Sequence, residues 1–336
     1  MPWYRHLLWP FAIFYGFGVS IRNLLFDLGV LSSKKFDVPV ICVGNLEVGG
    51  TGKSPLVNYI VQLLSTNNQN VAVLSRGYGR NTTGFRLVDY SSTAVDVGDE
   101  PLQAKKRFPN VTVAVCENRA VGIEQLLKMD PKPDVIVMDD GFQHRWVKPS
   151  VSILVTPSTK PFWSSQLLPV GTLREAKSGS KRADVLVLTG SQGTGDVNSF
   201  EGEVFYSKIT ASELIQFSGN KLIVSEIEDV MLFSGIANAE RFEESVAEVY
   251  RLAGHLKFSD HHNYSLSDLK PLRKLDSFGA AVNAVVTTEK DAARLANSTI
   301  LEELKDVPMF YLPIYTDFGE MTSEFDKMIL EHGKHA

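Results

Sequence analysis

The feature that most constrains the fold is a glycine-rich stretch that follows a short apolar run. The run "VPVICV" (38–43) has the composition of a buried strand, and "GNLEVGGTGKS" (44–54) comes directly after it. Apolar residues then recur at helical spacing over 54–67. A strand, a glycine-rich turn and a helix in this order are typical of a phosphate-binding loop, because glycines let backbone N–H groups approach phosphate oxygens at the helix N-terminus.

The loop departs from the usual spelling G-x-x-x-x-G-K-[ST] at the first glycine, whose place is held by Glu47. The stretch "GGTGKS" still supplies glycines beside the lysine, so we keep the phosphate-binding interpretation. In this interpretation Lys53 reaches the β- and γ-phosphates of a nucleotide, and the Ser54 hydroxyl binds Mg²⁺. The other expected nucleotide-binding residues of the loop are Gly49, Gly50, Thr51 and Gly52.

Short apolar runs alternate with helix-like segments through the first 190 residues. The expected strands cover 38–43, 70–74, 111–115, 134–138, 151–155 and 184–188. Helices are expected at 54–67 and 118–129. This alternation predicts an α/β fold, with a P-loop NTPase-like parallel sheet that carries helices on both faces.

A second alternating series predicts a smaller α/β domain. Its expected strands are 230–235, 256–258, 282–287 and 309–313, and its expected helices are 239–253, 267–277 and 291–296. The polar, glycine-rich segment 190–202 indicates a loop near a domain boundary. We therefore expect one domain over 1–205 and a second over 206–336, the last helix of which can pack back on the first domain.

Two adjacent carboxylates end the expected strand in "DVIVMDDGFQH" (134–144). An apolar strand ending in acid is a common pattern, but after a phosphate loop it indicates a Walker B site. Asp139 and Asp140 are therefore predicted to lie beside the loop, where one of them holds Mg²⁺ directly or through water. The sequence leaves open which of the two is nearer the metal.

Two charged residues stand at expected strand-to-helix connections, and spacing alone leaves their roles open. Asp99, in "VGDEP", is either an acid at a helix N-terminus or a base at the ligand edge of the sheet. Arg119, which follows the strand at 111–115, is either a surface charge or a phosphate clamp.

Two further polar stretches lie in the second half of the chain. The loop "FSDHHNYS" contains His261 and His262 after an aspartate, which favours acid–base work by an oriented imidazole, with metal binding as the alternative. In "TTEKDA", Thr288 and Asp291 fit a helix cap. The alternative is that Lys290 reaches the nucleotide when the domains close.

The N-terminal stretch "LLWPFAIFYGFGVS" (7–20) is uncharged and rich in aromatic residues. It is shorter than the roughly 20 apolar residues that span a bilayer, and Pro10, Gly16 and Gly18 interrupt it. We expect an amphipathic helix within about 1–30. It is either buried against the first domain or placed in the membrane interface.

Composition excludes several other classes of function. The formal net charge of -5 argues against a nucleic-acid partner, since a basic surface supplies most of that affinity. Cys42 and Cys116 lie in apolar runs without C-x-x-C spacing, which indicates buried thiols rather than a zinc site.

These stretches together resemble the tetraacyldisaccharide 4'-kinase family, the ATP-dependent kinases of lipid A biosynthesis. The matching stretches are "GNLEVGGTGKSP" (44–55), "SRGYGR" (75–80), "GDEP" (98–101), "DDGFQH" (139–144), "LLPVGTLRE" (167–175), "SDHH" (259–262) and "TTEKDA" (287–292). They follow the family's order and cover nearly the whole chain. The departures are mild: Ser54 stands where threonine is usual, Thr172 and Ala176 replace prolines, and Phe142 replaces a leucine.

The resemblance implies transfer of the ATP γ-phosphate, with Mg²⁺, to the 4'-hydroxyl of a tetraacyldisaccharide 1-phosphate. It implies that the P-loop kinase domain and the smaller domain close over ATP. It further implies that Asp99 pairs with His261 rather than His262, and that Lys53 completes the catalytic set. The residues expected to contact the substrate are Asn45, Arg76, Arg119, His144 and Glu175.

The resemblance also implies a monomer that docks its N-terminal helix on the cytoplasmic face of the bacterial inner membrane, where its lipid-linked disaccharide resides. The rival interpretation is a membrane-associated P-loop ATPase switch of the partitioning or targeting type, which would dimerise over the nucleotide. Such switches often carry a second lysine early in the loop, and Val48 at that place weighs against this interpretation.

Overall fold

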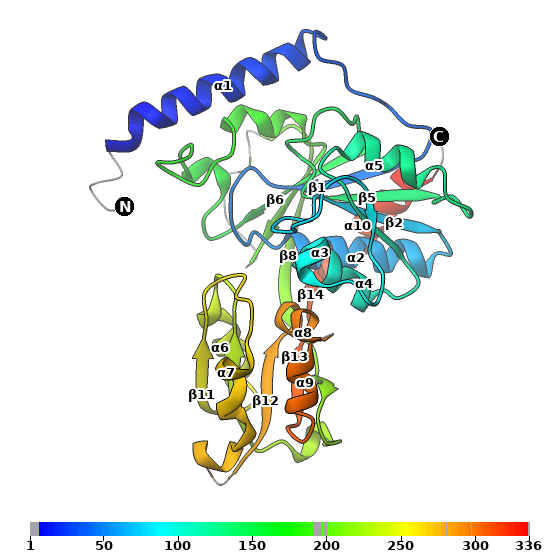
Figure 1. Cartoon of the computed structure of the whole chain (residues 1–336). Coiled ribbons are helices and arrows are strands. Elements are labelled where there is room, and N and C mark those ends of the chain that lie inside the picture. Colours follow the sequence, from blue (N-terminus) through cyan, green and yellow to red (C-terminus); the bar gives the residue numbers. More distant parts are fainter. Residues whose placement is uncertain (1–6, 191–196, 198–199, 280, 297, 335–336) are drawn as a thin grey trace.

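The computed structural model describes residues 7–190, 197, 200–279, 281–296 and 298–334, which form two α/β units (Figure 1). The first unit contains a nine-stranded sheet in the order β14-β8-β7-β6-β1-β5-β2-β4-β3, and the second a five-stranded sheet in the order β11-β10-β12-β13-β9. Within the first sheet the strands from β8 to β4 are parallel, and the edge strands β14 and β3 are antiparallel to their neighbours. In the second sheet only β9 runs antiparallel.

The bounds of the elements follow the predicted alternation. The strands of the first sheet are β1 (Val40–Gly44), β2 (Val71–Ser75), β3 (Arg86–Leu87), β4 (Thr112–Val115), β5 (Val135–Asp139), β6 (Val151–Pro157), β7 (Val185–Thr189), β8 (Glu203–Ala211) and β14 (Ile314–Asp317). Those of the second are β9 (Ile215–Ser218), β10 (Asp229–Ser234), β11 (Arg251–Lys257), β12 (Val282–Thr288) and β13 (Met309–Leu312). The α-helices are α1 (Trp9–Asp27), α2 (Lys53–Thr66), α3 (Ala94–Val97), α4 (Asp99–Arg107), α5 (Arg119–Leu126), α6 (Ala239–Ala247), α7 (Leu266–Leu269), α8 (Glu289–Leu295), α9 (Thr299–Glu303) and α10 (Thr322–His332).

Alternate residues of the first sheet enter cores on its two faces. In β1, Ile41 and Val43 pack in the cluster that contains the apolar residues of α2, α4 and α10. Val40 and Cys42 face the other way and pack with Ile123 of α5. Burial on both faces explains why these strands are continuous apolar runs, and it confirms the predicted parallel sheet with helices on both faces.

Two helix predictions in the second unit were wrong in extent. The helix expected over 239–253 ends at Ala247, and 251–257 forms β11, because this segment pairs in parallel with β10. Such pairing overrides local helical spacing. The helix expected over 267–277 is the short α7 followed by two 3₁₀ turns, where Pro271 cannot continue an α-helical hydrogen-bond ladder.

The chain crosses between the units twice. It leaves the first sheet after β8 and returns between β13 and β14, where Ser212 N donates to Pro313 O at 3.0 Å. The expected division at 205/206 falls inside β8, and β14 and α10 belong to the first unit, since Phe325 and Ile329 of α10 lie in its core. Most of the loop expected at 190–202 lies outside the described residues, which omit 191–196 and 198–199.

Helix α1 lies along the side of the first unit that is remote from the second unit (Figure 1). Its inner face is attached by polar contacts: Tyr15 Oη donates to Arg174 O at 2.7 Å, and Asn23 Nδ2 donates to Glu175 Oε2 at 2.9 Å. On its outer face the side chains of Phe11, Ile13, Phe14 and Phe17 are exposed. Among the described helices, none combines the length and the apolar character that crossing a bilayer requires.

Candidate active site

The phosphate loop occupies the turn from β1 to α2 and is held in shape by its own polar side chains. Gly52 precedes α2 with φ of 90°, a left-handed conformation that favours glycine, and a Cβ there would lie 2.9 Å from Thr189 Cγ2. Asn45 Nδ2 donates to Thr51 Oγ1 at 2.9 Å, and Thr189 Oγ1 donates to Thr51 O at 2.8 Å. Gly49 and Gly50 are exposed, with open space where side chains would be. The loop therefore presents free backbone at the start of a helix, as an anion site requires.

Glu47, which occupies the place of the usual first glycine, is a structural residue of the loop. Its side chain is buried, and its Oε1 accepts a hydrogen bond from Thr172 Oγ1 at 2.9 Å. Val48 N also donates to Thr172 O at 2.9 Å. Glu47 thus replaces the usual glycine and attaches the loop to Thr172, in the segment that precedes Arg174.

Asp140 lies between two cations at the end of β5. Lys53 Nζ is 3.5 Å from Asp140 Oδ1, and Arg174 Nη1 donates to both carboxylate oxygens at 3.0 and 2.8 Å. Burial opposes ionisation, but the charges of Lys53 and Arg174 outweigh it and lower the pKa of Asp140. Lys53 is therefore held beside the loop with its side chain only 11% exposed.

Asp139 has the surroundings of a cation ligand. Its side chain is buried, and Oδ1 has no hydrogen-bond partner among the described residues. Burial, together with the negative charges of Glu100 and Asp140, raises the pKa of Asp139. Ser54, Glu100 and Asp139 line one small space between α2 and α4. An unpartnered carboxylate oxygen near a hydroxyl fits Mg²⁺, which favours oxygen ligands.

Within the described part of the chain, no group of three or more His, Cys, Asp or Glu residues could hold a metal ion without other ligands. In nucleotide sites, Mg²⁺ is usually held by one or two protein groups together with phosphates and water. Ser54 and Asp139 are the residues that fit such an ion.

Asp99 and His261 come together from the two units. Asp99 begins α4 in the first unit, and its Oδ2 lies 2.5 Å from His261 Nδ1 in the loop after β11. Arg294 Nη2 donates to the same oxygen at 2.6 Å, and Lys290 Nζ is 3.9 Å from it. Although burial opposes it, the hydrogen bond and charge of Arg294, followed by the charge of Lys290 and the contact with His261, lower the pKa of Asp99.

His262 points away from this pair. Its ring stacks on Phe258 with centroids 4.7 Å apart, and its Nε2 lies 3.2 Å from Asp268 Oδ2. The geometry therefore favours His261 as the partner of Asp99. Thr288 caps α8, since its Oγ1 accepts from Asp291 N at 3.1 Å. Lys290, on the same helix, nevertheless reaches toward Asp99.

The residues expected to contact the substrate fall into two groups. Asn45 and Glu175 are fully buried, and Glu175 accepts hydrogen bonds from Asn23, Gln143 and Arg182. These two residues brace the phosphate loop and α1, and their contact with a substrate stays a prediction.

Arg119, His144 and Arg76 form the second group. Arg119 is buried and donates to the carbonyl oxygens of Asp139 and Asp140 at 3.4 and 3.5 Å, while its N donates to His144 Nε2 at 3.0 Å. Arg76 is exposed near them. Burial, together with the charges of Arg119, Arg22 and Arg76, lowers the pKa of His144 to about 4, so its ring is neutral near pH 7.

We expect His144 to make the fold acid-sensitive. Since the unfolded chain protonates this ring near pH 6.5 and the folded chain only near pH 4, stability is lost as pH falls through that window. The full shift corresponds to roughly 3 kcal/mol, and partial exposure reduces it to about 1–2 kcal/mol. Denaturant unfolding at pH 7 and pH 4.5 should show a smaller loss of free energy for His144→Gln than for the parent. His332→Gln, at the exposed end of α10, is the control. Equal losses for the parent and His144→Gln would contradict this assignment.

Three residues of the site were missed by sequence reasoning: Glu100, Arg174 and Arg294. Each stands in a stretch that drew attention, "GDEP", "LLPVGTLRE" and "TTEKDAAR". Burial beside a carboxylate was the missing signal, because the side chains of Arg294 and Arg174 are 5% and 25% exposed. A single sequence does not show which arginines are buried beside a carboxylate.

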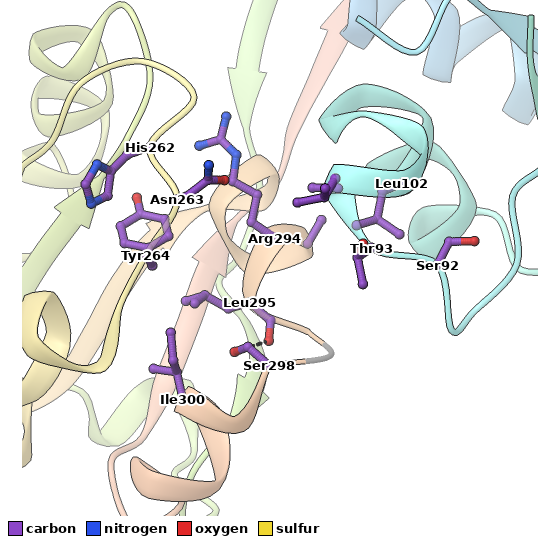
Figure 2. Close-up of a pocket in the computed structure, with 13 residues that line it drawn as sticks. Ser92, Thr93, Leu102, His262, Asn263, Tyr264, Arg294, Leu295, Ser298 and Ile300 are labelled. Carbon is purple, nitrogen blue, oxygen red and sulfur yellow. Dashed lines mark hydrogen bonds between the residues drawn. The ribbon is translucent and has the colours of Figure 1, made fainter. Parts of the chain in front are cut away.

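A cavity of about 450 Å³ lies between the α3–α4 segment of the first unit and α8, α9 and residues 262–264 of the second unit. Figure 2 shows Arg294 between the 262–264 loop and the α3–α4 segment. Arg294, His262 and Tyr264 contribute to its wall. The two units therefore meet at the Asp99–His261 contact and leave a cavity near Arg294.

Comparison with known proteins agrees with this geometry. The family model described as Tetraacyldisaccharide-1-P 4'-kinase matches residues 4–334. Proteins named tetraacyldisaccharide 4'-kinase are 40% identical in Flavobacterium psychrophilum, over 99% of this chain and 98% of that protein, and 39% identical in Parabacteroides distasonis, over 98% and 95%.

A solved structure is similar over the same extent. The structure of LpxK from Aquifex aeolicus, described as an "apo" form in complex with ATP, has a TM-score of 0.78 and 30% identity, and the match covers 98% of this chain and 99% of that one. The fold class is therefore that of P-loop kinases. The phosphate loop, the paired aspartates and the cross-unit Asp99–His261 contact accompany matches over almost the full length, and the chain belongs to the tetraacyldisaccharide 4'-kinase family.

Proposed function

We propose that this chain transfers the γ-phosphate of ATP to the 4'-hydroxyl of a tetraacyldisaccharide 1-phosphate, a step of lipid A biosynthesis. This is the reaction for which its relatives are named. The observation that carries the proposal is the Asp99–His261 contact at 2.5 Å, which joins the second unit to the first unit next to the phosphate loop. Glu100, the neighbour of Asp99, shares a small space with Ser54 and Asp139. An acid–base pair beside a triphosphate site fits a kinase that activates a hydroxyl.

The residues of the chain divide the work of phosphoryl transfer. Backbone N–H groups of Gly49–Ser54 and the Lys53 ammonium bind and orient the β- and γ-phosphates, and they stabilise the charge that develops there. Asp99 takes the proton from the sugar hydroxyl, and His261 holds that carboxylate in place. Bound Mg²⁺ would neutralise phosphate charge near Ser54 and Asp139. We assign Arg76, Arg119 and His144 to the surface that receives the anionic acceptor, with Arg119 and His144 forming its floor.

The direct test combines purified protein, ATP, Mg²⁺ and detergent-solubilised tetraacyldisaccharide 1-phosphate. The expected product is the 1,4'-bisphosphorylated lipid, formed in step with ADP. ATP hydrolysis that ignores the acceptor, accompanied by nucleotide-dependent dimers, would contradict the proposal and favour an ATPase switch.

We further propose that α1 docks a monomer on the cytoplasmic face of the inner membrane, where both ATP and a lipid acceptor are present. Phe11, Phe14 and Phe17 are 65%, 76% and 65% exposed on its outer face, while Tyr15 and Asn23 fasten its inner face to the first unit. A helix with one face fixed to the protein and an exposed aromatic face can bind at the boundary between lipid headgroups and acyl chains.

We expect the triple variant Phe11→Ser, Phe14→Ser, Phe17→Ser to lose most of its co-sedimentation with phospholipid vesicles. Each buried phenylalanine contributes about 2 kcal/mol, so the partition coefficient should fall by at least about 100-fold. The matched control replaces three exposed apolar residues of the second unit, Ile215, Ile223 and Val249, by serine. Unchanged sedimentation of the α1 variant would show that this face does not dock.

A further inference from the structure

Arg294 of α8 connects the two units at the catalytic pair. Its Nη2 donates to Asp99 Oδ2 at 2.6 Å, across 195 positions of sequence, and its side chain is only 5% exposed. Figure 2 shows the side chain extending from α8 along the gap between the units. A buried arginine that crosses between two units at a catalytic carboxylate is suited to control its orientation.

The second unit fixes the guanidinium by itself. Arg294 Nη1 donates to Asp291 Oδ1 at 2.5 Å and to Gly235 O at 2.8 Å. Asp291 is fully buried, and its Oδ2 accepts from Gly235 N at 3.1 Å and from Thr288 Oγ1 at 2.6 Å. The carbonyl of Gly235 also accepts from His261 N at 3.2 Å. Gly235, at the end of β10, and Asp291 therefore position both Arg294 and the backbone of His261.

Both residues approach the same oxygen of Asp99. His261 Nδ1 is 2.5 Å and Arg294 Nη2 2.6 Å from Oδ2, and Lys290 Nζ is 3.9 Å from it. In the part of the chain that the structure describes, no donor contacts Oδ1. We propose that Arg294 is a positioning residue that, with His261, occupies Oδ2 of Asp99 and leaves Oδ1 to receive the proton of the acceptor hydroxyl. The identity of that hydroxyl rests on the proposed function.

Loss of Arg294 has two expected consequences. The carboxylate of Asp99 becomes free to rotate, and a displacement of about 1 Å at a reacting group can cost about 100-fold in rate. The charge around Asp99 also becomes less positive, because the guanidinium of Arg294 is lost. The positive or titratable groups that remain are His261 and Lys290, and the nearby acids are Glu100, Asp260 and Asp291. With less positive charge the pKa of Asp99 rises, so the acidic limb of kcat/KM moves to higher pH.

The experiment compares Arg294→Met, Arg294→Lys and the double variant Asp291→Asn, Arg294→Met. The double variant removes both charges of a buried pair, because the single change leaves Asp291 buried without its partner and can destabilise the fold. Arg273→Met, which loses a surface pair with Glu303 in the same unit, is the matched control.

We expect both methionine variants to lower kcat by about 10–100-fold with the KM for ATP within a few-fold of the parent, and to show the upward shift of the acidic limb. Arg294→Lys should recover part of kcat, and the control should match the parent. A double variant that melts like the parent and retains the parental kcat and pH profile would overturn the inference.

A second readout does not depend on turnover. In ¹⁵N-histidine spectra the Nδ1 proton of His261, hydrogen-bonded to Asp99, should be visible in the parent and be lost to exchange in the double variant. Its persistence in that variant would count against positioning by Arg294. If the parent lacked kinase activity, the proposed function would fail, while this spectrum would still decide the role of Arg294.

Discussion

Asp99→Asn is expected to lower kcat for phosphoryl transfer by about 10²–10⁴-fold, the usual contribution of a general base, with little change in ATP affinity. Asparagine keeps the size of the side chain and can still accept from Arg294 and His261, but it cannot take up the proton of the sugar hydroxyl. ATP binding should persist because Asp99 begins α4, outside the loop of 49–54.

Single-turnover measurement with excess enzyme tests this expectation, because it reports the chemical step apart from product release. The matched control is Asp96→Asn, three residues earlier, where the carboxylate only caps α3 through Thr93. The control should retain parental kcat. An Asp99→Asn enzyme that keeps most of its parental rate would remove Asp99 from the base role.

The strands of the first sheet were predictable because they are buried on both faces. β1, β2, β5 and β7 are buried along their whole length, which leaves a continuous apolar run in the sequence. β8 was missed because most of its residues are exposed or half-buried, and it pairs with the distant strand β14. Pairing with a strand that is distant in the sequence leaves little local signal.

The residues of the candidate site also differ in how far local sequence predicts them. Lys53, Ser54 and the Asp139–Asp140 pair were predicted from local motifs, because a strand, a loop and a helix are adjacent in sequence. The pairing of Asp99 with His261 came from the family resemblance rather than from spacing, since 162 positions separate them.

The arginines at the site had no comparable signal. Arg294 lies 195 positions from Asp99, and Arg174 lies 34 positions from Asp140. Which of many basic residues reaches a given carboxylate is decided by packing between units. The same packing buries Asn45 and Glu175, whose expected contacts with a substrate came from their place in matching stretches.

Lys53→Met is expected to lower kcat by about 10²–10³-fold and to weaken ATP binding as well. The methionine has a similar length but no charge, so the β- and γ-phosphates lose a donor where charge develops, a loss of roughly 3–4 kcal/mol. The fold should persist, because Arg174 continues to neutralise Asp140 through two contacts.

The paired variant Asp140→Asn separates catalysis from local charge balance. If Lys53 mainly served to neutralise Asp140, the double variant Lys53→Met, Asp140→Asn would recover the activity lost by Lys53→Met. We expect no recovery, because the phosphates still lack their cation and the double variant has also lost a carboxylate of the site. Lys34→Met, which breaks an exposed pair with Glu124, is the control for loss of a lysine. Single-turnover rates and ATP titrations of these variants decide between the two roles, since restored transfer in the double variant would make Lys53 a partner of Asp140 rather than a ligand of the triphosphate.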